Sequence, residues 1–138
     1  MSAFTQSSRL AAYQSVAAHG GVAAADPHQL IVMLLDGALE RIAGAHGAIA
    51  NGALANKSRL IHKAVEILHE LHASLNFQSG GTIAANMGDL YDYASQLLLR
   101  ASLENRTELL DEVTNLLREI RSAWIAIPAA ARGARAVT

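Results

Sequence analysis

Apolar residues recur in alternating steps of four and three along four successive segments of the chain, which is the spacing of one face of an α-helix. The first stripe begins behind Asp26-Pro27, where Asp26 is expected to cap a helix, and stops at the turn signal Asn51-Gly52. The second helix is expected from about Lys57 to Asn76. The two stripes consist of Ile31, Leu35, Ala38, Ile42, Ala45 and Ile49, and of Ile61, Ala64, Leu68, Leu71 and Leu75.

Two further stripes follow. Thr82 is expected to cap the third helix, and Asn105, with Glu108 three residues on, the fourth, which Pro128 ends. Their stripes are Ile83, Met87, Leu90, Ala94, Leu97 and Ala101, then Leu109, Val113, Leu116, Ile120, Ala123 and Ile127. Because short connections make neighbouring helices antiparallel, the pattern predicts an all-α, antiparallel up-down four-helix bundle.

Length and composition agree with one helical domain. The chain has 138 residues, of which 51% are hydrophobic and only 4% aromatic, a balance that favours closely packed helices over a sheet. We expect three parts: residues 1–25 as an N-terminal segment with a short extra helix, residues 26–128 as the bundle, and residues 129–138 as a flexible C-terminal tail.

Charge and the N-terminal sequence argue against two kinds of partner. The formal net charge is -1 and the basic residues are spread along the chain, so we expect no nucleic-acid partner. The N-terminus has no long apolar run, so we expect neither a secretory signal nor membrane insertion, and a soluble protein. The lack of cysteine fits a reducing cytoplasm.

The six histidines are the candidates for chemistry. Glu66 and His69 lie at i and i+3, but a di-iron bundle needs a second such pair, which the sequence lacks. His69 and His72 are one residue too close for a zinc-protease motif. A histidine phosphotransfer domain shares the fold, yet His46, His62, His69 and His72 lack its sequence context. We expect no enzyme, metal or cofactor, and keep a histidine-based phosphotransfer or metal-binding bundle as the alternative.

Several helices carry a second apolar stripe beside the first. Its residues are Leu60 and Ile67, Tyr91 and Leu98, and Leu110, Leu117 and Trp124. Together they predict an apolar groove that binds an amphipathic helix, with flanking core positions, a generic helical adaptor or a homodimer interface as alternatives. A short helical pattern with Leu10 and Tyr13 is expected to cover the groove until a partner displaces it. Asn86 is expected either to bond a partner's backbone or to cap its own helix.

The order of several motifs resembles the flagellar export chaperone family FliS, over about residues 10 to 127. These motifs are Tyr13 with Val16, the run DPHQLIVMLLDGA from residue 26, Lys63-Ala64 with Ile67, Leu75-Asn76, the run GGTIAANM from residue 80, Leu90-Tyr91-Asp92-Tyr93, and Ala123-Trp124. Met87 and the pair Tyr93-Ala94 depart from the residues that are commoner in the family.

The resemblance implies a cytoplasmic, non-enzymatic chaperone of bacterial flagellum biogenesis. Such a protein would bind the C-terminal segment of flagellin, prevent its premature polymerisation, and deliver it to a component of the flagellar type III export gate. Tyr13 matches a characteristic aromatic residue of the family's N-terminal helix. A segment that is disordered when free and folds on binding suits an apolar groove.

Overall fold

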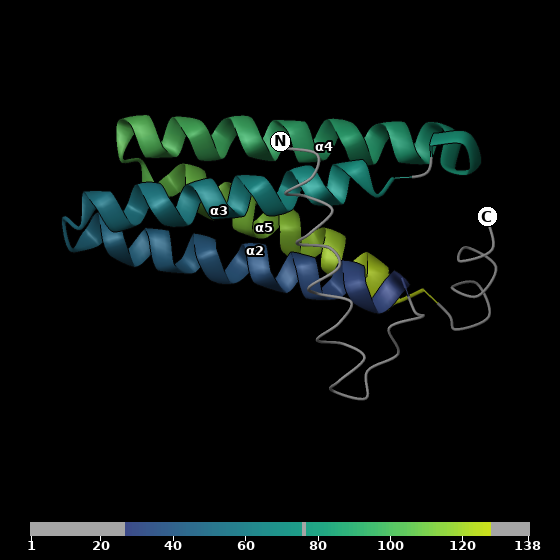
Figure 1. The fold of residues 1–138 in the computed structure, drawn as a ribbon, viewed down its shortest axis with the longest axis horizontal. Helices are drawn as coiled ribbons and strands as arrows, with labels where there is room; N and C mark the ends of the chain where they lie inside the picture. Colours follow the sequence, from purple (N-terminus) through teal and green to yellow (C-terminus); the bar gives the residue numbers. More distant parts are fainter. Residues whose placement is uncertain (1–26, 76, 128–138) are drawn as a thin grey trace, which may run out of the picture.

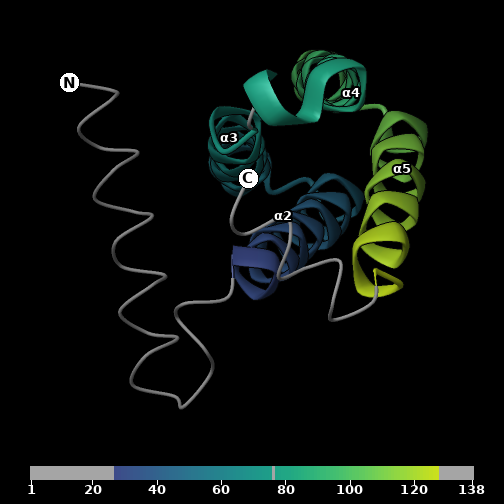
Figure 2. The ribbon, with the colours of Figure 1, turned by 90° about the vertical axis from the view of Figure 1, so that its right-hand side faces the viewer.

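The computed structural model of the protein describes residues 27–75 and 77–127. In these ranges the chain forms four α-helices and no strand: α2 (Pro27–Ala50), α3 (Leu54–Ala73), α4 (Phe77–Glu104) and α5 (Thr107–Ile125). Successive helices run in opposite directions (Figure 1), and α5 packs back against α2 to close a ring of four (Figure 2). The predicted all-α, antiparallel four-helix bundle is confirmed. The expected N-terminal helix and C-terminal tail lie outside the described residues, so the division into three parts stays a prediction.

The core is aliphatic with one buried phenol. On α2 and α3 the predicted stripes point into it, and Leu35, Ile61 and Leu68 are at most 1% exposed. The remaining large side chains that are buried almost completely are Leu34, Ile42, Leu71, Tyr91, Leu98, Leu110, Val113 and Leu117. Burial of so many aliphatic side chains is the main stabilising contribution to the fold.

On α4 and α5 the predicted stripes are confirmed only in part. Their buried members are Ala94, Leu97 and Ala101 on α4, and Leu109, Val113 and Ile120 on α5. Ile83 and Leu90, predicted to be buried, are 64% and 36% exposed, whereas Tyr91 and Leu98 are 2% and 0% exposed. On α5, Ala123 is exposed. Each helix of the ring packs against two neighbours, so it buries the sector between them, which includes most of the second stripe.

The structure bears on two expected helix caps. Helix α4 as a whole begins at Phe77, but a kink at Gly81, whose φ of 54° is readily adopted only without a Cβ, divides it directly before Thr82. The cap at Thr82 stays a prediction, whereas the cap at Asn105 is wrong. Asn105 does not begin α5 but has a φ of 54° in the preceding turn. Its Oδ1 accepts a hydrogen bond of 2.8 Å from Lys57 Nζ, which also donates to the Ser102 carbonyl at 2.7 Å. Lys57, buried on α3, thereby ties that helix to the end of α4.

Candidate partner-binding surface

An apolar stripe lies exposed on α4. Ile83, Asn86, Leu90 and Tyr93 follow one another at steps of three, four and three, so they share one face of the helix. Ile83 is 64% exposed, Leu90 36% and Tyr93 46%, and Asn86 is exposed as well. We call these four residues the α4 stripe. Three large apolar side chains with an amide between them match the spacing by which helices are recognised.

A hydrogen bond places the α4 stripe beside α5. The Tyr93 hydroxyl donates to Glu112 Oε2, and this acceptor raises the pKa of the phenol above its usual value. Leu116, one turn after Glu112, is partly buried and packs against the core. The stripe therefore borders the junction of α4 and α5, where a carboxylate already holds the phenol in place.

Four residues predicted to bind a partner lie in the core. Ile67, Tyr91, Leu98 and Leu117 are at most 4% exposed, because each lies in the sector of its helix that faces two neighbours. The prediction that their side chains line a surface groove is therefore wrong for the free chain. Burial also raises the pKa of Tyr91 to about 12, since ionisation is disfavoured away from water.

Three other predicted residues keep some exposure. Leu60 is partly buried and touches α2, where a Cβ built on Gly44 would lie 3.0 Å from Leu60 Cδ1. Trp124 is also partly buried; its ring centroid lies 5.4 Å from that of His28, and its carbonyl is hydrogen-bonded to His28 Nε2. Asn86 is exposed, in the α4 stripe. Leu10 and Tyr13 lie outside the described residues, so the predicted cover stays a prediction.

Sequence reasoning missed the surface role of Ile83, Leu90 and Tyr93. The first two were placed in a core stripe, and Tyr93 entered only through the family resemblance. A usable signal is the pair Gly80-Gly81, which breaks the helix just before Ile83 and separates its first turn from the regular bundle.

The surface between α2 and α5 is hollowed, and its lining is less apolar than the α4 stripe. This surface cavity of about 570 Å³ is lined by Ile42, Ala43, His46, Gly47, Asp111, Thr114, Asn115 and Arg118. His46 Nε2 lies 3.4 Å from Asp111 Oδ1. Most of the lining is polar or small, so the cavity fits the apolar face of a helix less well than the α4 stripe does.

Within residues 27–75 and 77–127, no three His, Asp or Glu side chains come together as a group that could hold a metal ion. In the same ranges, none of the helices combines the length and apolar character needed to cross a membrane.

The comparisons with known proteins agree on one family. The model of the family described as "Flagellar protein FliS" matches residues 9–131, which include every described helix. The chain belongs to the FliS family. Its FliS relatives cover most of its length and most of their own.

Three of these relatives carry the same kind of name. The flagellar secretion chaperone FliSB of Pseudomonas aeruginosa is 42% identical over 81% of this chain and 89% of its own length. The flagellar secretion chaperones FliS of Salmonella typhimurium and Vibrio cholerae are 39% and 36% identical over 85% and 86% of this chain, and over 87% and 88% of their own lengths. The chain is thus a member of a family of flagellar secretion chaperones, and the α4 stripe lies inside the matched region.

Proposed function

We propose that this protein is a cytoplasmic chaperone that holds the C-terminal segment of flagellin, prevents its premature polymerisation, and delivers it to the flagellar type III export apparatus. The observation that carries the proposal is membership of a family whose relatives, 36 to 42% identical over more than four fifths of the chain, are named flagellar secretion chaperones. The role is one of binding, without catalysis.

The α4 stripe is the surface we assign to the secretion substrate. A partner helix laid along it would bury Ile83, Leu90 and Tyr93 with its own apolar side chains at i, i+3, i+4 and i+7. Asn86 sits between Ile83 and Leu90, where its amide can bond a frayed turn of the partner. Leu60 and Trp124, at the edges of the core, are the predicted binding residues that a longer segment could still reach.

The physics of such binding fits a carrier that must release its cargo. A segment that folds only when it binds the chaperone loses roughly 2 to 5 kcal/mol of binding free energy to its own ordering. This loss lowers the net affinity for a given buried area. Binding would also compete with the bond between Tyr93 and Glu112. The cargo is thereby kept from other flagellin molecules and remains releasable at the export gate.

Calorimetric titration tests the proposal. The full-length chain is titrated with flagellin from the same organism and, separately, with flagellin that lacks its C-terminal segment. We expect one-to-one binding with a negative heat-capacity change, lost on truncation, because apolar surface is buried. Leu90→Glu should weaken binding at least about tenfold, since it puts a charge into the apolar contact.

Leu103→Glu is the matched control, because Leu103 is exposed on a different face of α4. Equal affinities for intact and truncated flagellin would overturn the proposed substrate. Equal effects of Leu90→Glu and Leu103→Glu would overturn the assignment to the α4 stripe while leaving the substrate standing.

A further inference from the structure

The charged side chains of α5 are divided between its two flanks. Glu112 faces α4, because its carboxylate accepts the hydrogen bond of the Tyr93 phenol. Glu119 is exposed and lies on the same flank, seven residues or about two turns further on. The other flank faces α2 and carries both arginines of the helix: Arg121 is paired with an aspartate of α2, and Arg118 lines the hollow between the two helices. Within α5, which is described throughout, the flank beside the α4 stripe is therefore acidic and carries no lysine or arginine.

Helix α4 adds no basic residue along the stripe. Residues 82–99 contain no lysine or arginine, whereas Asp89, one turn before Tyr93, is exposed. Carboxylates therefore border the apolar side chains of the stripe on α4 and on α5. Because the net charge of the whole chain is only -1, this acidic border is a local feature of the surface.

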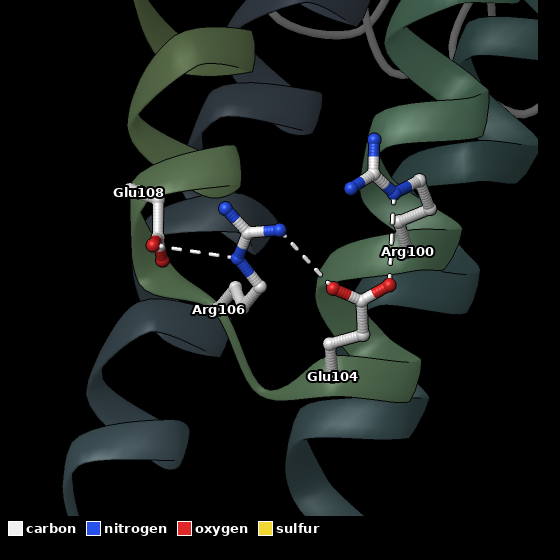
Figure 3. Close-up of polar contacts among 4 residues, drawn as sticks. All are labelled: Arg100, Glu104, Arg106 and Glu108. Atoms are coloured by element: carbon white, nitrogen blue, oxygen red, sulfur yellow. Dashed lines mark hydrogen bonds and ion pairs between the residues drawn. The ribbon is translucent and has the colours of Figure 1, made fainter.

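The basic residues that follow the stripe are paired with carboxylates of their own (Figure 3). The Nε atom of Arg100, near the end of α4, lies 3.7 Å from Glu104 Oε2. Arg106 in turn bridges Glu104 and Glu108 at 3.2 and 3.3 Å. The two positive and two negative charges cancel, so this end of the junction between α4 and α5 has no net charge. The acidic border of the stripe is not neutralised from here.

We propose that the α4 stripe selects an amphipathic helix whose flank toward α5 carries lysine or arginine. This inference rests on the proposed function, because it describes the secretion substrate to which the stripe is assigned. The apolar side of such a helix covers Ile83, Leu90 and Tyr93, while its basic side chains reach Glu112 and Glu119. Since these two glutamates are seven residues apart, the basic residues of the partner are spaced by about seven as well.

A second copy of the chain is a poor occupant of the same surface. Two copies that met through their α4 stripes would bring two acidic borders together, and like charges across an interface are repulsive. A basic flank replaces this repulsion by attraction and also speeds the encounter of the two molecules at low salt. The charges thus favour a different chain over self-pairing, and a basic helix over an acidic one.

Two synthetic helical peptides test the inference without relying on flagellin. Both carry the same apolar face at i, i+3, i+4 and i+7, but one has lysine and the other glutamate along its flank. Each is titrated into the full-length chain at about 50 mM salt, where the lysine peptide should bind at least about fivefold more tightly. The preference should fall to about twofold or less at about 500 mM salt, because the charges are then screened.

Charge reversal on α5 tests the location of the contact. Glu119→Lys should abolish the preference for the lysine peptide or invert it, because the flank then repels a basic partner. Glu40→Lys is the matched control: it changes the net charge equally at an exposed position of α2, which lies diagonal to α4 in the ring (Figure 2). This control should keep the preference. Circular dichroism checks that both variants retain their helices.

The outcomes separate this inference from the proposed function. Equal binding of the two peptides, or no binding of either below about 1 mM, overturns the inference. An equal response of Glu119→Lys and Glu40→Lys does the same. Self-association of the free chain that Leu90→Glu abolishes would show a second copy as the occupant, and would also overturn it. Failure of flagellin to bind in a parallel titration, while the lysine peptide is preferred, would instead overturn the proposed substrate and leave the inference standing.

Discussion

The α2–α3 half of the bundle hides its apolar side chains, whereas the α4–α5 half displays them. Among the described residues, every large hydrophobic side chain that is exposed lies on α4 or α5, except Leu54. Gly44 lets α2 approach Leu60 of α3 closely. Helix α4, with 28 residues against 20 in α3, is longer than its neighbour, and it carries Ile83 near one end and Leu103 near the other.

Helices α2 and α3 are therefore mainly structural, whereas α4 also exposes large apolar side chains. The α2–α3 pair buries most of its two stripes and contributes stability. Helix α4 has one buried face, and it exposes the α4 stripe as well as Leu99 and Leu103. Three experiments test this contrast between the two halves of the bundle.

The largest effect is expected on the buried face of α4. Leu98→Ala should lower the free energy of unfolding by about 3 kcal/mol or more, because Leu98 is fully buried and leaves a cavity. Leu99→Ala, one residue on and 51% exposed, should cost less than about 1 kcal/mol. Urea unfolding of the two variants gives the comparison. Similar losses in the free energy of unfolding would mean that the exposed side of α4 contributes to stability as much as its buried side.

Tyr91 and Tyr93 lie on different faces of α4, so their effects on the free energy of unfolding at alkaline pH should differ. Burial raises the pKa of Tyr91 from 10.0 to about 12, so the unfolded chain loses this proton first as pH rises. The neutral phenol of Tyr91 therefore contributes about 2 to 3 kcal/mol to the free energy of unfolding. This contribution is fully present below pH 10 and is lost as the pH rises toward 12. Urea unfolding at pH 9 and pH 11 should show a smaller alkaline loss in Tyr91→Phe than in the unmodified chain. In Tyr93→Phe, at an exposed site, the free energy of unfolding should fall between pH 9 and pH 11 almost as much as in the unmodified chain.

The smallest effect concerns the joint between the two halves. Lys57→Met removes the donor to the Ser102 carbonyl and to Asn105 Oδ1, and should destabilise the fold by about 2 kcal/mol. Lys63→Met, at an exposed position of the same helix, should change stability little. Thermal unfolding compares the two. An equal response would show that the ammonium of Lys57 adds nothing to the joint.

Much of the fold could be predicted from spacing. The periodicity of apolar residues gave four helices, and the turn signal Asn51-Gly52 placed the break between α2 and α3. The signal Ser79-Gly80-Gly81 coincides with the kink inside α4, whereas the break between α3 and α4 comes earlier, after Ala73. The contact that Asn105 makes in place of the expected cap could not be predicted, because its side chain accepts a hydrogen bond from Lys57, 48 positions away in the sequence. Of the predicted binding residues, Asn86 lies on the surface, while Tyr91 and Leu98 do not.

The helices, their order and the family could all be inferred from the amino-acid sequence, because periodicity, turn residues and motif order are local or linear properties. Spacing could not show that α4 buries residues of both neighbouring apolar stripes, among them Leu97 of the first stripe and Tyr91 and Leu98 of the second. Which sector of the helix is buried depends on where α3 and α5 contact it, and that is a property of the assembled bundle. The packing places Tyr91 inside and Tyr93 outside, and it leaves Ile83 and Leu90 exposed although their spacing predicted both as core.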